Sequence, residues 1–120
     1  MIVGIGIDLA EVERYRFTPE KLERFARKIY TDEEVRYALR KRDHSQSLAG
    51  FFAAKEATRK AFGVAMPWRQ ISVTHGPCGA PLLVLSGGAA DVLRQRGVIA
   101  AHLTITHTER TAAAVVVLES

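Results

Sequence analysis

Residues 50–63 show the clearest periodic pattern in the chain, and the period is that of an α-helix. The stretch has no proline, is rich in alanine and unbranched side chains, and ends at Gly63, a residue that suits a left-handed helix cap. At about 100° per residue, small and aromatic side chains gather on one half of this helix. The other half carries the charged side chains Lys55, Glu56, Arg59 and Lys60. We therefore expect a buried alanine-rich half and a polar half that holds Glu56 in a fixed position.

Residues 1–9 alternate with a period of two, which predicts a strand. One face is apolar, and the other carries Gly4, Gly6 and Asp8. Glycines inside a strand cost stability, so this pair indicates that a ligand or another backbone comes close. A plain crossing by a strand or helix accounts for the pair equally well. Asp8 could also simply cap a following helix.

The remaining pattern predicts an α+β fold in a single domain, residues 1–120. The final run is rich in alanine and valine, as a strand buried on both faces would be. The predominance of hairpins indicates a largely antiparallel sheet packed on the long central helix. The other predicted elements are a helical turn at 10–16, helices from 19 to about 30 and from 31 to about 42, a polar loop at 43–47, strands at 70–75 and 81–86, a helix at 89–96, and strands at 102–108 and 111–119.

Composition and charge narrow the possible partners and location. The chain has 120 residues and a net charge of +4, so an acidic partner is plausible, and a chain of this size often gains stability by oligomerising. The single Cys78 excludes an intrachain disulfide. There is no leader pattern, no apolar run of about 18 residues and no lipidation signal, so we expect a cytoplasmic location.

One predicted helix has a basic outer face. Its positive side chains, with one just upstream, are Arg14, Lys21, Arg24, Arg27 and Lys28. Such a face is commonly just solvated, and it could also dock an acidic protein or nucleic acid.

The residues that could carry chemistry are two acids, a lysine and a histidine. Asp8 and Glu56 are hard carboxylates of the kind that hold Mg²⁺ together with water and phosphate oxygens, and Lys60 would neutralise phosphate charge. A helical Glu56–Lys60 ion pair, worth roughly 0.2–0.5 kcal/mol, needs no function at all. His107 ends a strand before a tight turn, where it could meet a phosphate or be an ordinary surface histidine. No zinc, nucleophile-elbow or nucleotide-loop motif is present.

Six short motifs occur in a fixed order along the chain. They are Gly4-Ile-Gly-Ile-Asp8, Phe52-Ala-Ala-Lys-Glu-Ala57, Lys60-Ala-Phe-Gly63, Gly79-x-Pro81, Ile105-Thr-His-Thr108 and Ala112-Ala-Ala-Val115. In this order and spacing they resemble the holo-acyl-carrier-protein synthases, the small bacterial 4′-phosphopantetheinyl transferases, over essentially the whole chain. The resemblance implies the 4′-phosphopantetheinyl transferase fold.

The resemblance also implies a reaction. Mg²⁺ would be held by Asp8, Glu56 and the diphosphate of coenzyme A, the co-substrate. A serine hydroxyl of apo acyl carrier protein would attack the β-phosphate in line, so that 4′-phosphopantetheine is transferred and adenosine 3′,5′-bisphosphate is released. Lys60 would stabilise the developing charge, and Glu56 is the candidate base for the serine proton.

Further roles follow from the same resemblance. Gly63 and His107 would join Asp8 and Lys60 in binding coenzyme A. The acidic carrier protein would dock on Arg14, Arg24 and Lys28, and the family is typically a homotrimer with sites between subunits. It implies no nucleic-acid or membrane partner.

The chain departs from the family pattern at several positions, namely Phe51, Val64-Ala65, Ala80 and Thr104. Phe51 and Ala80 replace common basic residues, which puts coenzyme A affinity in question. Two other classes remain open from the residues alone: a basic nucleic-acid-binding module and a non-catalytic subunit of the same fold.

Overall fold

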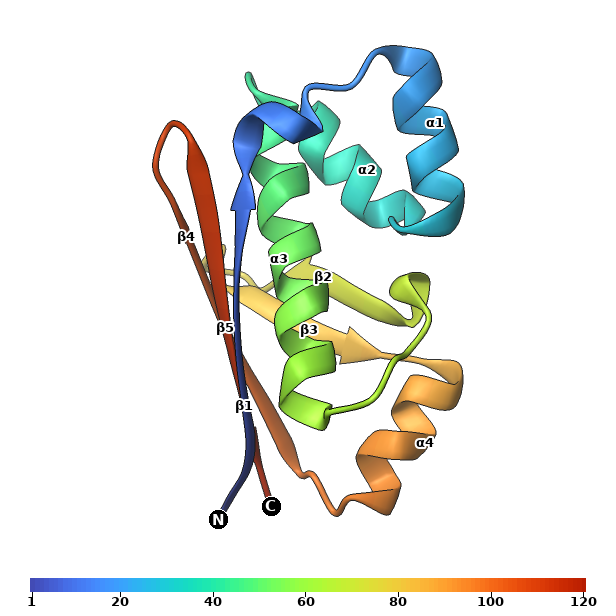
Figure 1. The fold of residues 1–120 in the computed structure, drawn as a ribbon, viewed down its shortest axis with the longest axis vertical. Coiled ribbons are helices and arrows are strands. Elements are labelled where there is room, and N and C mark those ends of the chain that lie inside the picture. Colours follow the sequence, from blue (N-terminus) through green and yellow to red (C-terminus); the bar gives the residue numbers. More distant parts are fainter.

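The structure is a computed structural model that describes residues 1–120 (Figure 1). Four α-helices, five strands and two short 3-10 helices follow one another. In chain order they are β1 (Ile2–Glu11), η1 (Val12–Tyr15), α1 (Pro19–Lys28), α2 (Asp32–Leu39), α3 (His44–Phe62), η2 (Trp68–Gln70), β2 (Ile71–His75), β3 (Pro81–Leu85), α4 (Gly87–Gln95), β4 (Ala100–His107) and β5 (Thr111–Glu119).

The strands form two antiparallel sheets. β5 lies between β1 and β4 in a three-stranded sheet, and β2 and β3 form a separate hairpin. The long helix α3 packs against one face of the three-stranded sheet, and the hairpin and the other helices lie beyond it (Figure 1). This arrangement confirms the predicted α+β fold with a largely antiparallel sheet on a central helix. None of the helices is long and apolar enough to cross a membrane.

The glycines of β1 bring that strand directly against the backbone of α3. A Cβ atom at Gly6 would lie 1.8 Å from the carbonyl oxygen of Ala57, and one at Gly4 would lie 2.1 Å from that of Ala61. No side chain fits in so short a gap, so only glycine permits this approach. The predicted close approach is confirmed, and the approaching backbone is that of the central helix.

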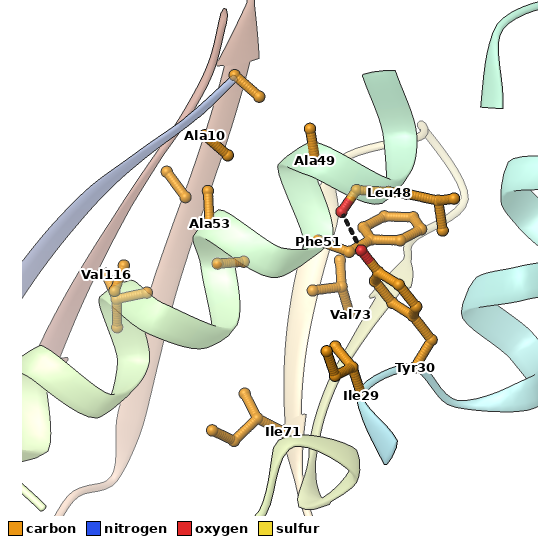
Figure 2. Close-up of a cluster of buried hydrophobic side chains, with 14 of the residues drawn as sticks. Ala10, Ile29, Tyr30, Leu48, Ala49, Phe51, Ala53, Ile71, Val73 and Val116 are labelled. Carbon is orange, nitrogen blue, oxygen red and sulfur yellow. Dashed lines mark hydrogen bonds between the residues drawn. The ribbon is translucent and has the colours of Figure 1, made fainter. Parts of the chain in front are cut away.

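The other side of α3 packs on the hairpin and on the segment between α1 and α2 (Figure 2). Ile71 and Val73 of β2 and Tyr30 are almost completely buried there. The Tyr30 hydroxyl donates a hydrogen bond to the Leu48 carbonyl at 2.9 Å, so this buried polar group is satisfied. Helix α3 is therefore fixed from both sides.

The opposite face of the three-stranded sheet is uncovered (Figure 1). Along β1 the exposed fractions of Ile5, Ile7 and Leu9 are 61%, 59% and 66%. On β5 only alternate residues are buried, and those between them, such as Val115, are partly exposed. The prediction that this strand is buried on both faces is therefore wrong for the single chain.

Two further predictions about α3 are wrong. The helix begins at His44 rather than after a polar loop at 43–47, because Asp43 accepts the backbone N–H of Ser45 at 3.0 Å and caps it. Lys55 does not lie on an exposed polar half but is fully buried, with its ammonium nitrogen 2.9 Å from a carboxylate oxygen of Glu34. Burial lowers the pKa of Lys55, and the Glu34 carboxylate opposes that shift.

Candidate active site

Asp8 and Lys60 meet at the edge where β1 runs along α3. The Lys60 ammonium lies 3.0 Å from Asp8 Oδ1 and also donates to the Ile7 carbonyl at 3.0 Å. The Asp8 side chain is only 16% exposed, whereas Lys60 is half exposed. Lys60 thus bridges the helix to the strand instead of pairing with Glu56, and Asp8 does not cap the following η1 helix.

Glu56 projects from α3 one turn before Lys60 and is partly buried. Tyr15 of η1 packs against the preceding turn of α3, with its ring centroid 5.9 Å from that of Phe52. Burial raises the pKa of Tyr15 to about 12, and the negative charges of Asp8 and Glu56 add to the shift while Arg14 opposes it. Lys60 contacts Asp8 and follows Glu56 by one helical turn, so Asp8, Glu56 and Lys60 face one region of the fold and are called here the carboxylate cluster.

This carboxylate cluster has the chemistry of a magnesium site. No group of three or more His, Cys, Asp or Glu side chains lies close enough to hold a metal with protein ligands alone. Mg²⁺ is commonly bound through one or two carboxylates, with waters and substrate phosphates as its other ligands. Asp8 and Glu56 supply two hard oxygen donors of that kind, so the residues present fit this ion.

A second candidate site is a cavity of about 660 Å³ between α2, α3, the hairpin and the end of β4. His107 lines it, as do the basic residues Lys41 and Arg42. The rings of Tyr37 and His75 are stacked in its wall with centroids 3.9 Å apart. Burial, with help from Lys41, lowers the pKa of His75. The cavity is thus aromatic and mainly basic, as a pocket for a phosphorylated ring compound would be.

Helix α3 separates this cavity from the carboxylate cluster. Ser47 lines the cavity, and Glu56 follows it by nine residues in α3. At about 100° per residue, this spacing points Glu56 about 180° around the helix from Ser47, so it lies on the opposite flank. His107 and Asp8 lie on the two outer strands, β4 and β1, with β5 between them. One chain therefore does not bring all the predicted site residues together. Gly63, in the left-handed cap after α3 with φ 71°, is exposed.

The predicted docking residues lie on the surface near the start of the chain. Arg24 and Lys28 are exposed on α1 and form no ion pair, and Arg14 lies 3.6 Å from Glu11 with its side chain 76% exposed. The basic face of α1, defined here as Arg24 and Lys28 with Arg14 of η1, is therefore open to a partner.

Some residues near the two candidate sites were not singled out by their sequence pattern. Tyr15 lies beside the carboxylates only because η1 folds back onto Phe52, and the stacked Tyr37–His75 pair joins two distant elements. No local motif marks such contacts. The one available signal was the spacing of aromatic residues, which core packing explains equally well.

Comparison with known proteins shows the class of protein to which the chain belongs. The model of the 4′-phosphopantetheinyl transferase superfamily matches residues 4–116. The chain therefore belongs to this superfamily, as the order of its sequence motifs predicts.

The relatives within that superfamily are holo-[acyl-carrier-protein] synthases. The protein of this name from Koribacter versatilis is 41% identical over 124 residues, covering 99% of each chain. The crystal structure of the Neisseria meningitidis synthase superposes with a TM-score of 0.89 at 31% identity over the whole of both chains. A synthase from Bacillus anthracis in complex with CoA (3′,5′-ADP) gives a TM-score of 0.80 at 35% identity, covering 100% of this chain and 98% of that one.

Proposed function

We propose that the chain is a holo-[acyl-carrier-protein] synthase, which transfers 4′-phosphopantetheine from coenzyme A to a serine of apo acyl carrier protein. The observation that carries this proposal is the ion pair of Asp8 with Lys60, one helical turn after Glu56, in a member of the transferase superfamily. The Bacillus anthracis relative was solved with CoA (3′,5′-ADP), which matches the proposed substrate and the adenosine 3′,5′-bisphosphate product.

Asp8 and Glu56 would hold Mg²⁺ at the edge where β1 runs along α3. When bound, the ion would draw negative charge from the diphosphate of coenzyme A. Asp8 suits the role of ligand because its carboxylate is held between the strand and Lys60, with little freedom to move. Lys60 donates to Asp8 and to the Ile7 carbonyl, so its third N–H is free to contact a phosphate oxygen.

The same residues account for the chemical step. The serine oxygen would form a bond to the β-phosphorus while the bond from that phosphorus to the bridging oxygen breaks. The bridging oxygen leaves with the bonding electron pair as part of the adenosine 3′,5′-bisphosphate. Glu56, partly buried near Asp8, would accept the serine proton. Lys60 would stabilise the charge that develops on the phosphate oxygens.

Substitution of the two acids tests this assignment. Asp8→Asn and Glu56→Gln should each lower kcat by about a hundredfold or more, because each removes a carboxylate that would hold the metal at the reacting phosphates. Asp91→Asn, on exposed α4, is the matched control and should leave kcat unchanged. Full activity in both acid variants would overturn the metal site. Tight binding of an oligonucleotide without Mg²⁺ would favour the nucleic-acid-binding alternative instead.

We further propose that the chain forms a homotrimer with its sites between subunits. Two observations support this: the uncovered apolar face formed by Ile5, Ile7 and Leu9, and the separation of the His107 cavity from Asp8 within one chain. Monomers rarely leave so apolar a face exposed. In an assembly, the cavity of one subunit could complete the carboxylate cluster of the next, and coenzyme A would span the two.

Mixing two impaired variants tests that arrangement. Asp8→Asn and His107→Ala chains, allowed to exchange subunits, should regain activity because about a quarter of the sites in random trimers combine two intact halves. No recovery after demonstrated exchange would place each site within one chain.

We also propose a cytoplasmic location, since the exposed thiol of Cys78 suits a reducing compartment.

A further inference from the structure

Arg59 lies over the ring of Trp68, one helical turn from Glu56. Its guanidinium carbon lies 3.9 Å from the centroid of the Trp68 ring. Its side chain is partly exposed and forms no ion pair or hydrogen bond within the chain. A stacked arginine has already lost much of its side-chain freedom, so binding a partner costs little further side-chain entropy at this residue.

The position of Arg59 on α3 places it close to the proposed chemistry. It lies three residues after Glu56 and seven after Phe52, so the three side chains share one flank of the helix. Lys60 adds a second positive charge next to it, and no acidic side chain neutralises Arg59. The Arg59 guanidinium is therefore an unpaired positive charge next to the carboxylate cluster.

A continuous row of aromatic rings joins Arg59 to the basic face of α1. The ring of Trp68 lies 5.1 Å from that of Phe52, which in turn packs on Tyr15. The successive rings of the row are Trp68, Phe52, Tyr15, Phe17 and Phe25. Phe25 is itself a residue of α1, the helix that carries Arg24 and Lys28. Packed aromatic rings thereby connect the two basic groups.

We propose that Arg59, stacked on Trp68, is a second anchor for the acidic carrier protein, binding a carboxylate close to the serine that is modified. This inference rests on the proposed function, and it extends the docking surface from α1 across the aromatic row to α3. The surface is positive at both ends, and the partly exposed rings of Trp68, Phe52 and Tyr15 lie between them, whereas Phe17 is buried. This pattern complements a helix with acidic side chains around an apolar stripe. Arginine and tryptophan are also the residue types that most often dominate interface energies.

The chain contains a built-in reporter for this contact. Trp68 is its only tryptophan, so fluorescence excited at a wavelength that tyrosine does not absorb comes from the ring beneath Arg59 alone. Titrating a tryptophan-free bacterial apo acyl carrier protein into the chain, without coenzyme A or metal, should change this fluorescence and give a Kd. Arg59→Ala should raise that Kd on the order of tenfold, and Arg59→Lys, which keeps the charge but not the planar fork, should raise it less.

A control of equal charge separates docking from overall electrostatics. Arg94→Ala, on exposed α4, lowers the net charge by the same amount and should leave the Kd within about twofold of the parent value. In turnover, Arg59→Ala should raise the KM for the carrier protein and leave the KM for coenzyme A unchanged. Since the fluorescence of Arg59→Ala could itself differ, calorimetry with the same carrier provides an independent Kd.

The outcomes distinguish this inference from the proposed function. An unchanged Kd in Arg59→Ala, equal losses in Arg94→Ala, or a change confined to the KM for coenzyme A would each overturn the anchor. Failure of the parent chain to bind the carrier would overturn it as well. Carrier binding that depends on Arg59 without any transfer would support the anchor and overturn the proposed function alone.

Discussion

Replacing Lys55 with methionine removes the positive half of a fully buried ion pair. The Lys55 ammonium contacts a carboxylate oxygen of Glu34 at 2.9 Å, donates to the Trp68 carbonyl at 3.0 Å, and donates to the Ile71 carbonyl. Glu34 also accepts backbone N–H groups from Thr31 at 2.9 Å and from Val73 at 2.8 Å. The pair therefore joins α2, α3, η2 and β2 at one point in the core.

The expected loss follows from what the substitution leaves behind. Methionine fits the space of the lysine stem, but the Glu34 carboxylate stays buried without its counter-charge and two carbonyls lose their donor. Breaking a buried pair in this way costs about 3–5 kcal/mol. The free energy of unfolding of a domain is about 5–15 kcal/mol, so at least about a fifth of it would be lost.

The double variant Glu34→Gln/Lys55→Met provides the sharper comparison. Glutamine removes the stranded charge and keeps an oxygen that can accept an N–H, so the double variant should be more stable than Lys55→Met alone. Urea unfolding followed by circular dichroism measures both, with exposed Lys28→Met as the control, expected within about 0.5 kcal/mol of the parent. A loss below about 1 kcal/mol in Lys55→Met, or a double variant less stable than the single, would refute the reasoning.

Three further predictions concern the fold and the assembly. Gly6→Ala should destabilise the chain by about 1–3 kcal/mol in urea unfolding, because its Cβ would meet the Ala57 carbonyl; a neutral effect would mean that β1 and α3 can separate freely. Ile7→Glu should convert the proposed trimer to monomers in light scattering, whereas an unchanged mass would show that this face is not the interface. Asp43→Ala should cost about 1 kcal/mol at neutral pH. A hydrogen bond from Ser45 lowers the pKa of Asp43. The stabilisation by Asp43 should therefore be complete above about pH 4 and be lost as the pH falls through the lowered pKa. A stability difference between the parent and Asp43→Ala that persists in acid would contradict this.

Local chemistry made much of the fold predictable. The capping box of Thr31 and Glu34 forms both of its hydrogen bonds, Thr18 caps α1, and Gly63 ends α3 in the left-handed conformation. These features depend on residues within one turn of each other, so the sequence contains the whole interaction. The start of α3 was missed because a cap by Asp43 and a polar loop look alike when the first helical turn is itself polar.

The interactions that depend on distant segments were not predictable. Glu34 fits a helix cap in the sequence, and only the fold shows that its second oxygen faces β2 and that Lys55 reaches the same carboxylate. The same limit applies to the candidate site. Asp8 and Glu56 could be chosen by residue type, but their meeting requires the glycine contact between β1 and α3. That His107 and Asp8 lie on the two outer strands of one sheet follows from strand order, which no local pattern specifies.

The central claim, phosphopantetheine transfer, is tested most directly by the intact mass of the carrier protein. Apo acyl carrier protein would be incubated with the chain, coenzyme A and Mg²⁺, alongside a matched reaction containing EDTA. We predict a gain in mass equal to one phosphopantetheine group, abolished by EDTA and absent with Asp8→Asn. An unchanged mass with several different carrier proteins would contradict the account, and a gain that persists in EDTA would contradict the metal site alone.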